Sequence, residues 1–278
     1  MRLDLHHISK SYGNHLALSD VSISIRENDI VGLVGKNGAG KSTLLKIIAG
    51  LLSPSSGSIE LSQSGSRIGY LSERNPLPQS LYVKEYLHGL ASLHGLGYDA
   101  VDLWIHEIGL KEVAHRPISE LSKGYKQRLG LTSVLIHDPE IIILDEPING
   151  LDPLQIIEYR RVIQKAAIGK IVILSSHLMQ EIDAICNRIV VLNDGCISSD
   201  FRPELSTLFI LDVEVDQAME VPFDIIDGTQ VKVSGNNSFR IRADKDVRTE
   251  VFDHAVSQQV RILKMDLVRD PVQQLLVL

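Results

Sequence analysis

Two short segments of the chain carry residue types that suit phosphate and metal chemistry. The first, residues 35–42, reads Gly-Lys-Asn-Gly-Ala-Gly-Lys-Ser and matches the pattern GxxxxGK[ST]. Its glycines let the backbone wrap closely around a phosphate with the N–H groups pointing inward. Lys41 is expected to neutralise the β- and γ-phosphates of a nucleotide, and Ser42 to place its hydroxyl on Mg²⁺.

The residues around this loop supply the context that such a loop requires. Residues 30–34 form a nearly continuous apolar run, as in a strand buried on both faces. Residues 42–49 are helical in character and end at Gly50, so the positive end of a helix would face the phosphates. Taken alone, the loop fits a kinase, a GTPase or an ATPase, but no NKxD guanine-reading motif follows it.

The second segment places two carboxylates at the end of another apolar run, residues 141–144. Ligands of open parallel sheets bind at the carboxyl ends of the strands, where Asp145 and Glu146 would lie. Asp145 is expected to hold Mg²⁺ through its water shell, and Glu146 to orient or deprotonate the attacking water. His177, at the end of a third strand, is positioned to donate a hydrogen bond to the γ-phosphate.

Apolar runs and helical periodicity alternate along the first 203 residues, which predicts an α/β domain with a largely parallel sheet. The opening residues 3–8 and 21–25 alternate as half-buried strands do. Residues 74–137 are expected to form a helical subdomain. The other predicted elements are strands at residues 140–144, 170–174 and 188–192 and helices at residues 121–137, 154–167 and 178–186.

The pattern changes after residue 203, and residues 204–278 are predicted to form a small α+β accessory domain. Val247, Val251 and Ala255 fall on one helical face, which a small sheet would bury. The region holds no phosphate, metal or nucleophile motif. Its role is left open between regulation or dimer support and a plain extension that adds stability.

Composition limits the classes of function. The chain has 278 residues, 44% of them hydrophobic and 23% charged, an ordinary globular balance. A formal net charge of −7 argues against broad nucleic-acid binding, which needs a basic face. Cys186 and Cys196 form no CxxC pair or zinc-ligand spacing. No stretch approaches the roughly 20 apolar residues needed to span a bilayer, so a membrane role would require a spanning partner.

In this order, the motifs resemble those of the ABC ATPase family over about residues 1–202. The distinguishing element is residues 121–128, Leu-Ser-Lys-Gly-Tyr-Lys-Gln-Arg, which is similar to the family signature LSGGQxQR. The resemblance implies that Ser122 and the N–H of Gly124 bind the γ-phosphate held by a second subunit. It also implies a mostly parallel core sheet, an antiparallel β subdomain and a helical subdomain.

Further positions take roles from the same resemblance. Tyr12 falls where the family stacks an aromatic ring on adenine, and residues 149–152 look like the D-loop that links paired sites. The implied nucleotide-binding set is Tyr12, Gly35, Lys36, Asn37, Gly38, Ala39, Gly40, Lys41, Ser42, Thr43, Glu73, Ser122, Gly124 and Asp152. The implied catalytic set is Lys41, Glu146 and His177, and the metal set is Ser42, Glu73 and Asp145.

One departure from the family pattern is informative. Glu73 stands where the family normally has a glutamine, and this resembles the gliding-motility type of ATP-binding subunit, which pairs with exporter-like membrane subunits. Glutamate can ligate Mg²⁺, but it brings charge where glutamine brings none. Nucleotide sensing by this loop is therefore expected to differ.

The resemblance implies an ATP hydrolase that energises a membrane transporter, with ATP and Mg²⁺ as cofactors. Two copies, or two paired ABC subunits, would bind ATP between them at the cytoplasmic face of the inner membrane, beside an integral membrane permease. The alternative is a soluble ABC ATPase acting on nucleic acid or the ribosome. Fewer than 90 residues separate loop and signature, with no sustained heptads for a long coiled coil, which disfavours the DNA-repair form. The transported substrate cannot be inferred.

Overall fold

The structure, a computed structural model, describes residues 1–149, 151–176, 182, 185–202, 209–217, 229–235, 237–243, 247–258 and 260–268. The chain divides into two compact units, Met1–Arg202 and Pro203–Leu278. Each unit is described by itself below. The predicted helix at residues 178–186 and His177 fall largely or wholly outside the described residues.

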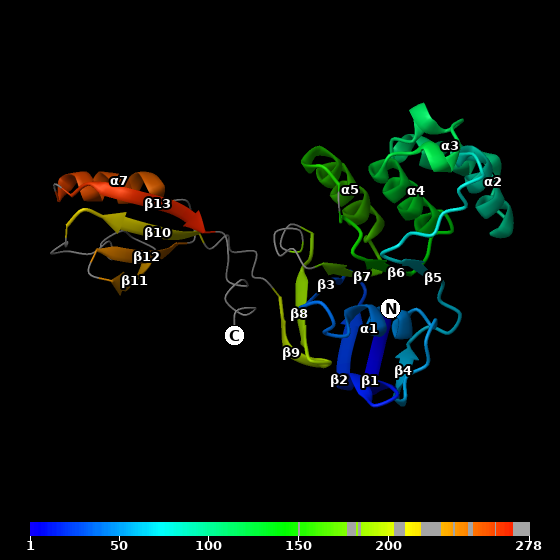
Figure 1. The fold of residues 1–278 in the computed structure, drawn as a ribbon, viewed down its shortest axis with the longest axis horizontal. Helices are drawn as coiled ribbons and strands as arrows, with labels where there is room; N and C mark the ends of the chain where they lie inside the picture. The colour runs from blue at the N-terminus through cyan, green and yellow to red at the C-terminus, as the bar shows by residue number, and fades with distance from the viewer. Residues whose placement is uncertain are drawn as a thin grey trace. The chain divides into compact units, whose positions relative to one another are not determined.

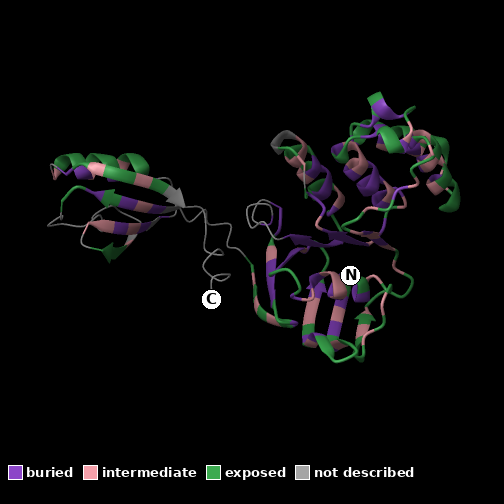
Figure 2. Cartoon of the chain, in the orientation of Figure 1, coloured by how far each residue is buried: buried purple, intermediate pink, exposed green. Residues whose placement is uncertain are grey.

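A six-stranded sheet forms the centre of the first unit, and it is parallel except at one edge. Its order is β5 (Ile68–Leu71), β6 (Ile141–Asp145), β7 (Ile171–Ser176), β3 (Ile30–Val34), β8 (Arg188–Asn193) and β9 (Cys196–Phe201), with β9 antiparallel to β8. Every residue of β6 and β7 is buried, as the continuous apolar runs predict for strands covered on both faces. Figure 2 shows these central strands as buried.

Helices and a second sheet cover the two faces of this central sheet. In Figure 1, α1 (Lys41–Ile48) lies on one side of the central sheet, together with the three-stranded antiparallel sheet. That second sheet has the order β2 (His15–Arg26), β1 (Arg2–Tyr12) and β4 (Ser56–Leu61). One hydrophobic core joins α1, both sheets and the face of β6 that carries Ile141 and Ile143.

The opposite face of the central sheet carries the remaining long helices. α4 (Lys123–Leu135) and α5 (Pro153–Ala166) lie there in Figure 1. α2 (Val83–Leu93) and α3 (Tyr98–Glu107) pack against each other, followed by single 3₁₀ turns η1 (Lys111–Val113) and η2 (Ile118–Glu120). No helix in the described part of the chain combines the length and apolar character needed to cross a bilayer.

The described residues of the second unit form an antiparallel sheet and one helix. The strand order is β11 (Thr229–Gly235), β12 (Ser238–Ala243), β10 (Phe209–Val215) and β13 (Ile262–Val268). α7 (Arg248–Ser257) packs on the sheet through Val251 and Ala255, and Val247 just before it is also fully buried. These are the three residues that helical spacing places on one buried face.

Candidate active site

The loop between β3 and α1 has glycine at two positions where packing admits no side chain. A β-carbon at Gly35 would lie 2.3 Å from the carbonyl oxygen of Leu192, and one at Gly40 would lie 2.5 Å from that of Ala17. Gly40 also has φ +102°, a left-handed conformation that glycine adopts without strain. The neighbouring β8 and β2 therefore press the loop into a tight curve around the start of α1.

Lys41, the first residue of α1, points its side chain back into this loop. Its Nζ donates hydrogen bonds to the carbonyl oxygens of Gly35, at 2.7 Å, and Lys36, at 3.3 Å. The side chain is buried although it is a lysine. An ammonium group held at a helix N-terminus inside a curved backbone concentrates positive charge where phosphate oxygens bind.

Asp145 ends β6 and lies next to the first turn of α1. Its Oδ1 accepts a hydrogen bond from the Ser42 hydroxyl at 3.2 Å and another from the Ser175 hydroxyl at 2.7 Å. Asp145 is almost fully buried. A hydroxyl and a carboxylate side by side are the hard oxygen donors that Mg²⁺ prefers, so these residues fit the metal that the sequence implies.

Ser175 is a site residue that motif analysis missed. It pairs with Asp145 in the parallel register of β6 and β7, and its Oγ also accepts the N–H of Glu146 at 2.9 Å. The signal available in the sequence was the polar pair Ser175-Ser176 closing an apolar strand. That pair alone does not reveal which carboxylate the hydroxyl meets.

Glu146 follows Asp145 with a backbone that few non-glycine residues adopt. Its φ is +49°, in the left-handed region, which costs an L-residue about 1–2 kcal/mol. The hydrogen bond from its N–H to Ser175 helps to hold this conformation. Such outliers persist where surrounding structure fixes them, often at functional sites. The turn aims the half-buried side chain differently from an ordinary strand residue.

Two other predicted residues lie at the surface. Tyr12, at the end of β1, is about half exposed, with the Lys10 ammonium 5.5 Å from its ring centroid. Glu73 is exposed in the turn after β5, the strand that pairs with β6. A tyrosine ring this exposed is compatible with stacking on a base. Among the described residues, no hydrogen bond or ion pair joins the side chain of Tyr12 or Glu73 to the glycine-rich loop.

The signature residues begin α4. Ser122 is its N-cap, and the Ser122 Oγ accepts a hydrogen bond from the N–H of Tyr125 at 3.4 Å. Gly124 is buried against α5, where a β-carbon would lie 2.3 Å from the Gln155 amide oxygen. In Figure 1, α4 and α1 lie on opposite sides of the central sheet. No hydrogen bond connects Ser122 or Gly124 with residues 35–42 in the described part of the chain.

The predicted D-loop connects the carboxylate turn to α5. Asp152 is the N-cap of α5 and accepts the N–H of Gln155 at 3.0 Å. Deeper in the unit, the Gln127 amide of α4 donates to the carbonyl oxygen of Pro147 at 2.7 Å. The turn that carries Glu146 is thus hydrogen-bonded to the signature helix. Gly150 and His177 lie outside the described residues.

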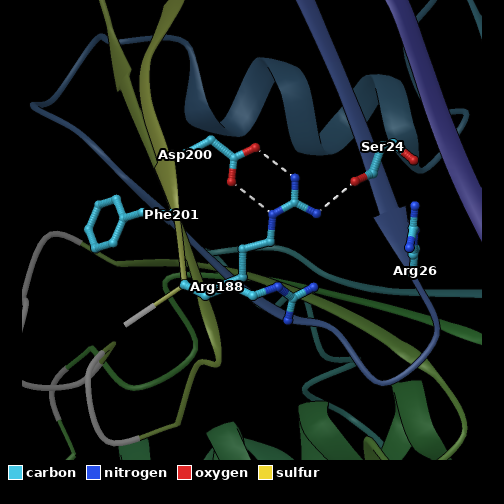
Figure 3. A pocket seen from close by; sticks show the side chains of 6 residues that line it. Ser24, Arg26, Arg188, Asp200 and Phe201 are labelled. Carbon is cyan, nitrogen blue, oxygen red and sulfur yellow. Dashed lines mark hydrogen bonds and ion pairs between the residues drawn. The ribbon is translucent and has the colours of Figure 1, made fainter. Parts of the chain in front are cut away.

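A separate hollow of about 470 Å³ lies at the ends of β2, β8 and β9 (Figure 3). Its centre is Arg188, whose guanidinium forms two hydrogen bonds with Asp200, at 2.8 and 2.6 Å. Arg188 also donates to the carbonyl oxygen of Ser24 and contacts the buried carboxylate of Asp29. The Arg188 guanidinium is thus already bound to two carboxylates and a carbonyl oxygen. We therefore interpret this hollow as a structural feature and not as a ligand site.

Comparison with known proteins places these features in context. A family model described as "ABC transporter" matches residues 18–149. The lantibiotic transport ATP-binding protein SrtF of Streptococcus pyogenes is 36% identical over 202 residues, which are 70% of this chain and 88% of SrtF. The bacitracin transport ATP-binding protein BcrA of Bacillus licheniformis is 34% identical over 200 residues, 68% of this chain and 65% of BcrA.

Solved structures show the same fold. The dimeric structure of MJ0796, described as a bacterial ABC transporter cassette, superimposes with a TM-score of 0.66 at 23% identity. The match covers 72% of this chain and 98% of that one. The predicted fold class is confirmed: a P-loop ABC ATPase fold with a mixed, mainly parallel sheet, an antiparallel β subdomain and helices, to which a C-terminal antiparallel sheet is added.

Proposed function

This chain belongs to the ABC transporter family as an ATP-binding protein, and we propose that it hydrolyses ATP to ADP and phosphate to energise an exporter. The observation that most supports ATP hydrolysis is the convergence of three groups at one end of the central sheet. The loop with Lys41 follows β3, Asp145 at the end of β6 is hydrogen-bonded to Ser42 of α1, and Glu146 comes directly after Asp145. Phosphate binding, metal binding and proton abstraction then share one site.

In this proposal the glycine-rich loop and Lys41 bind the β- and γ-phosphates of ATP. The Lys41 Nζ would exchange its bonds to the Gly35 and Lys36 carbonyls for bonds to phosphate oxygens. Ser42 and Asp145 would hold Mg²⁺, with Glu73 as a further candidate ligand. When bound, Mg²⁺ neutralises negative charge on the phosphate oxygens during transfer.

Glu146 is the proposed general base. Its carboxylate would accept a proton from the water that attacks the γ-phosphorus, while the bond to the leaving oxygen of ADP breaks. Fixing its backbone through Ser175 limits the positions that the carboxylate can sample. His177 is proposed to donate a hydrogen bond to the γ-phosphate.

The site is proposed to be completed by a second copy or a paired ABC subunit. Ser122 is exposed at the N-terminus of α4, and a hydroxyl can accept the Tyr125 N–H while donating its own proton to a phosphate. Asp152 and the Gly124 N–H would contribute from the same side. The dimeric MJ0796 cassette supports this arrangement.

The export direction and the partner are finer parts of the proposal. SrtF and BcrA are described as transport proteins for a lantibiotic and for bacitracin, and this supports an exporter that acts with an integral membrane permease. The chain would then lie at the cytoplasmic face of the cell membrane. The narrower gliding-motility type rests mainly on Glu73 and its flanking residues and stays a prediction.

Recovery of a partner from cell membranes tests the proposed function. We expect the tagged chain, purified from detergent-solubilised membranes, to bring down a multi-span membrane protein. We propose that the partner binds the surface formed by residues 73–115, because this region resembles the family's Q-loop and helical subdomain. Tyr82 lies in this region and is about half exposed at the N-cap of α2. Tyr82→Asp should greatly reduce recovery of the partner and leave basal ATP hydrolysis within about twofold.

Leu16→Asp provides a matched control, because Leu16 is equally exposed but lies in β2 of the antiparallel sheet. It should leave recovery of the membrane protein unchanged. Recovery of ribosomal particles or nucleic acid in place of a membrane protein would contradict the exporter and favour the soluble class of ABC ATPase.

A further inference from the structure

The Asp145 carboxylate has one satisfied oxygen and one open oxygen. Both hydroxyl donors, Ser42 and Ser175, reach Oδ1. Among the described residues no hydrogen bond reaches Oδ2, although Asp145 is 2% exposed. Each carboxylate oxygen can accept more than one hydrogen bond, so Oδ2 is free to accept one from a neighbouring donor.

Tyr70 has a hydroxyl group that could donate a hydrogen bond to this oxygen. It lies on β5, which pairs in parallel with β6 so that Tyr70 is opposite Ile143, two residues before Asp145. Side chains two apart on a strand share a face, so Tyr70 and Asp145 lie on the same face of adjacent strands. The Tyr70 hydroxyl is buried and has no hydrogen-bond partner among the described residues.

The two groups interact electrostatically. Burial first, then the negative charge of Asp145, a hydrogen-bonding interaction with the same carboxylate and the charge of Glu73 raise the pKa of Tyr70 to about 12. The Tyr70 hydroxyl is therefore close to Asp145, but it makes no hydrogen bond of normal geometry with a described residue. A tyrosine hydroxyl can donate one hydrogen bond.

We propose that Tyr70 is a positioning residue whose hydroxyl donates to the open Oδ2 of Asp145 when nucleotide and metal bind. Three hydroxyls, from Ser42, Ser175 and Tyr70, would then fix the rotation of the carboxylate about its last side-chain bond. Partners of this kind orient metal-binding carboxylates and tune their affinity for the ion. The inference rests on the proposed role of Asp145 at the metal.

A purely structural role for Tyr70 makes a different prediction. Its ring packs against the hydrophobic core shared by both sheets and α1. If filling that core were its whole role, phenylalanine would serve equally well. Removal of one buried, unpartnered hydroxyl would leave stability unchanged or slightly higher. Tyr70→Phe therefore separates positioning from packing.

The experiment measures how ATP binding depends on Mg²⁺. At fixed ATP, the Mg²⁺ concentration for half-maximal binding should rise about tenfold in Tyr70→Phe, the lower part of the range for partners of metal-binding carboxylates. ATP affinity in EDTA should stay within about twofold of the wild-type value. The melting temperature should not fall, which shows that the variant is folded.

Tyr159→Phe is the matched control. The Tyr159 hydroxyl is also buried and unpartnered among the described residues, but it lies on α5, on the opposite side of the central sheet from α1. It should leave the Mg²⁺ dependence unchanged. An unaltered Mg²⁺ dependence in Tyr70→Phe, beside a normal wild type, would overturn this inference alone. A wild-type chain with no Mg²⁺-dependent ATP binding would overturn the proposed function as well.

Discussion

At the level of single residues, the most consequential feature is a buried lysine whose partners are backbone carbonyls. The Lys41 ammonium is held by Gly35 and Lys36 inside the loop that surrounds it. Neutral carbonyl oxygens bind an ammonium group less strongly than anionic phosphate oxygens do. The side chain is therefore prepared for an anion.

Replacement of Lys41 tests whether its ammonium group binds the phosphates of ATP. We expect Lys41→Ala to weaken ATP binding at least tenfold in isothermal titration, because one charge-assisted contact to the phosphates is lost. Lys46→Ala, an exposed lysine on the same helix, is the control and should bind ATP as the wild type does. Equal affinity in both variants would exclude Lys41 from the phosphate site.

The sequence reveals those site residues that belong to a recognisable motif. The proximity of Ser42 and Asp145, 103 residues apart, follows from placing both at the carboxyl ends of parallel strands. Ser175 and Tyr70 carry no motif of their own. Their importance comes from strand order and register, which bring β5 and β7 to the two sides of β6.

At the level of elements, sequence periodicity predicts strand bounds most accurately for strands that are buried on both faces. The strands at β3, β6 and β8 fall within a residue or so of the expected runs, because both faces of each are covered. β4 and β9 were not predicted. Their exposed and half-buried positions carry serine and glycine, so apolar alternation is weak. Pairing with β1, which is distant in the sequence, defines β4, and a tight hairpin turn at residues 193–196 pairs β9 with β8.

One buried carboxylate joins several of these elements. Asp29, between β2 and β3, accepts hydrogen bonds from the Arg26 N–H, from Arg188 on β8 and from Arg202 just after β9. Burial acts to raise the pKa of Asp29, but the Arg26 N–H and the charges of Arg202 and Arg188 outweigh it and hold the pKa below its ordinary value. The ionised form is thus the one that the fold stabilises.

This direction sets the pH dependence of Asp29→Asn. Because the folded pKa is the lower one, the contribution of Asp29 to stability is present above the unfolded pKa of about 3.9. It is lost as the pH falls through the folded pKa. At pH 7 we expect the variant to lose about 1–3 kcal/mol of unfolding free energy. The difference in unfolding free energy between the variant and the wild type should decrease below about pH 4.

Urea denaturation followed by Trp104 fluorescence measures this, because the single tryptophan lies in α3 of the first unit. Asp20→Asn removes an exposed carboxylate paired with His7 and should change stability by less than about 1 kcal/mol. A destabilisation by Asp29→Asn that is the same at pH 7 and pH 3 would show that charge is not the cause.

At the level of the whole molecule, the separation of the signature from the glycine-rich loop within one chain is the main structural fact. Ser122 is exposed and Gly124 packs on α5, and neither is hydrogen-bonded to the loop in the part of the chain that the structure describes. In the proposed function, two chains supply the missing halves to each other. In that proposal ATP would bind more tightly to the closed pair than to either chain, and this difference in affinity would drive closure.

The measurement that tests this account most directly is the mass of Glu146→Gln in solution, with and without Mg²⁺ and ATP. The substitution keeps the shape of the side chain and removes the proposed base, so ATP should bind but turnover should fall by a factor of about 10² or more. Light scattering coupled to gel filtration should then show a chain whose mass doubles when ATP is added. A variant that hydrolyses ATP at the wild-type rate and keeps the mass of one chain would contradict the account.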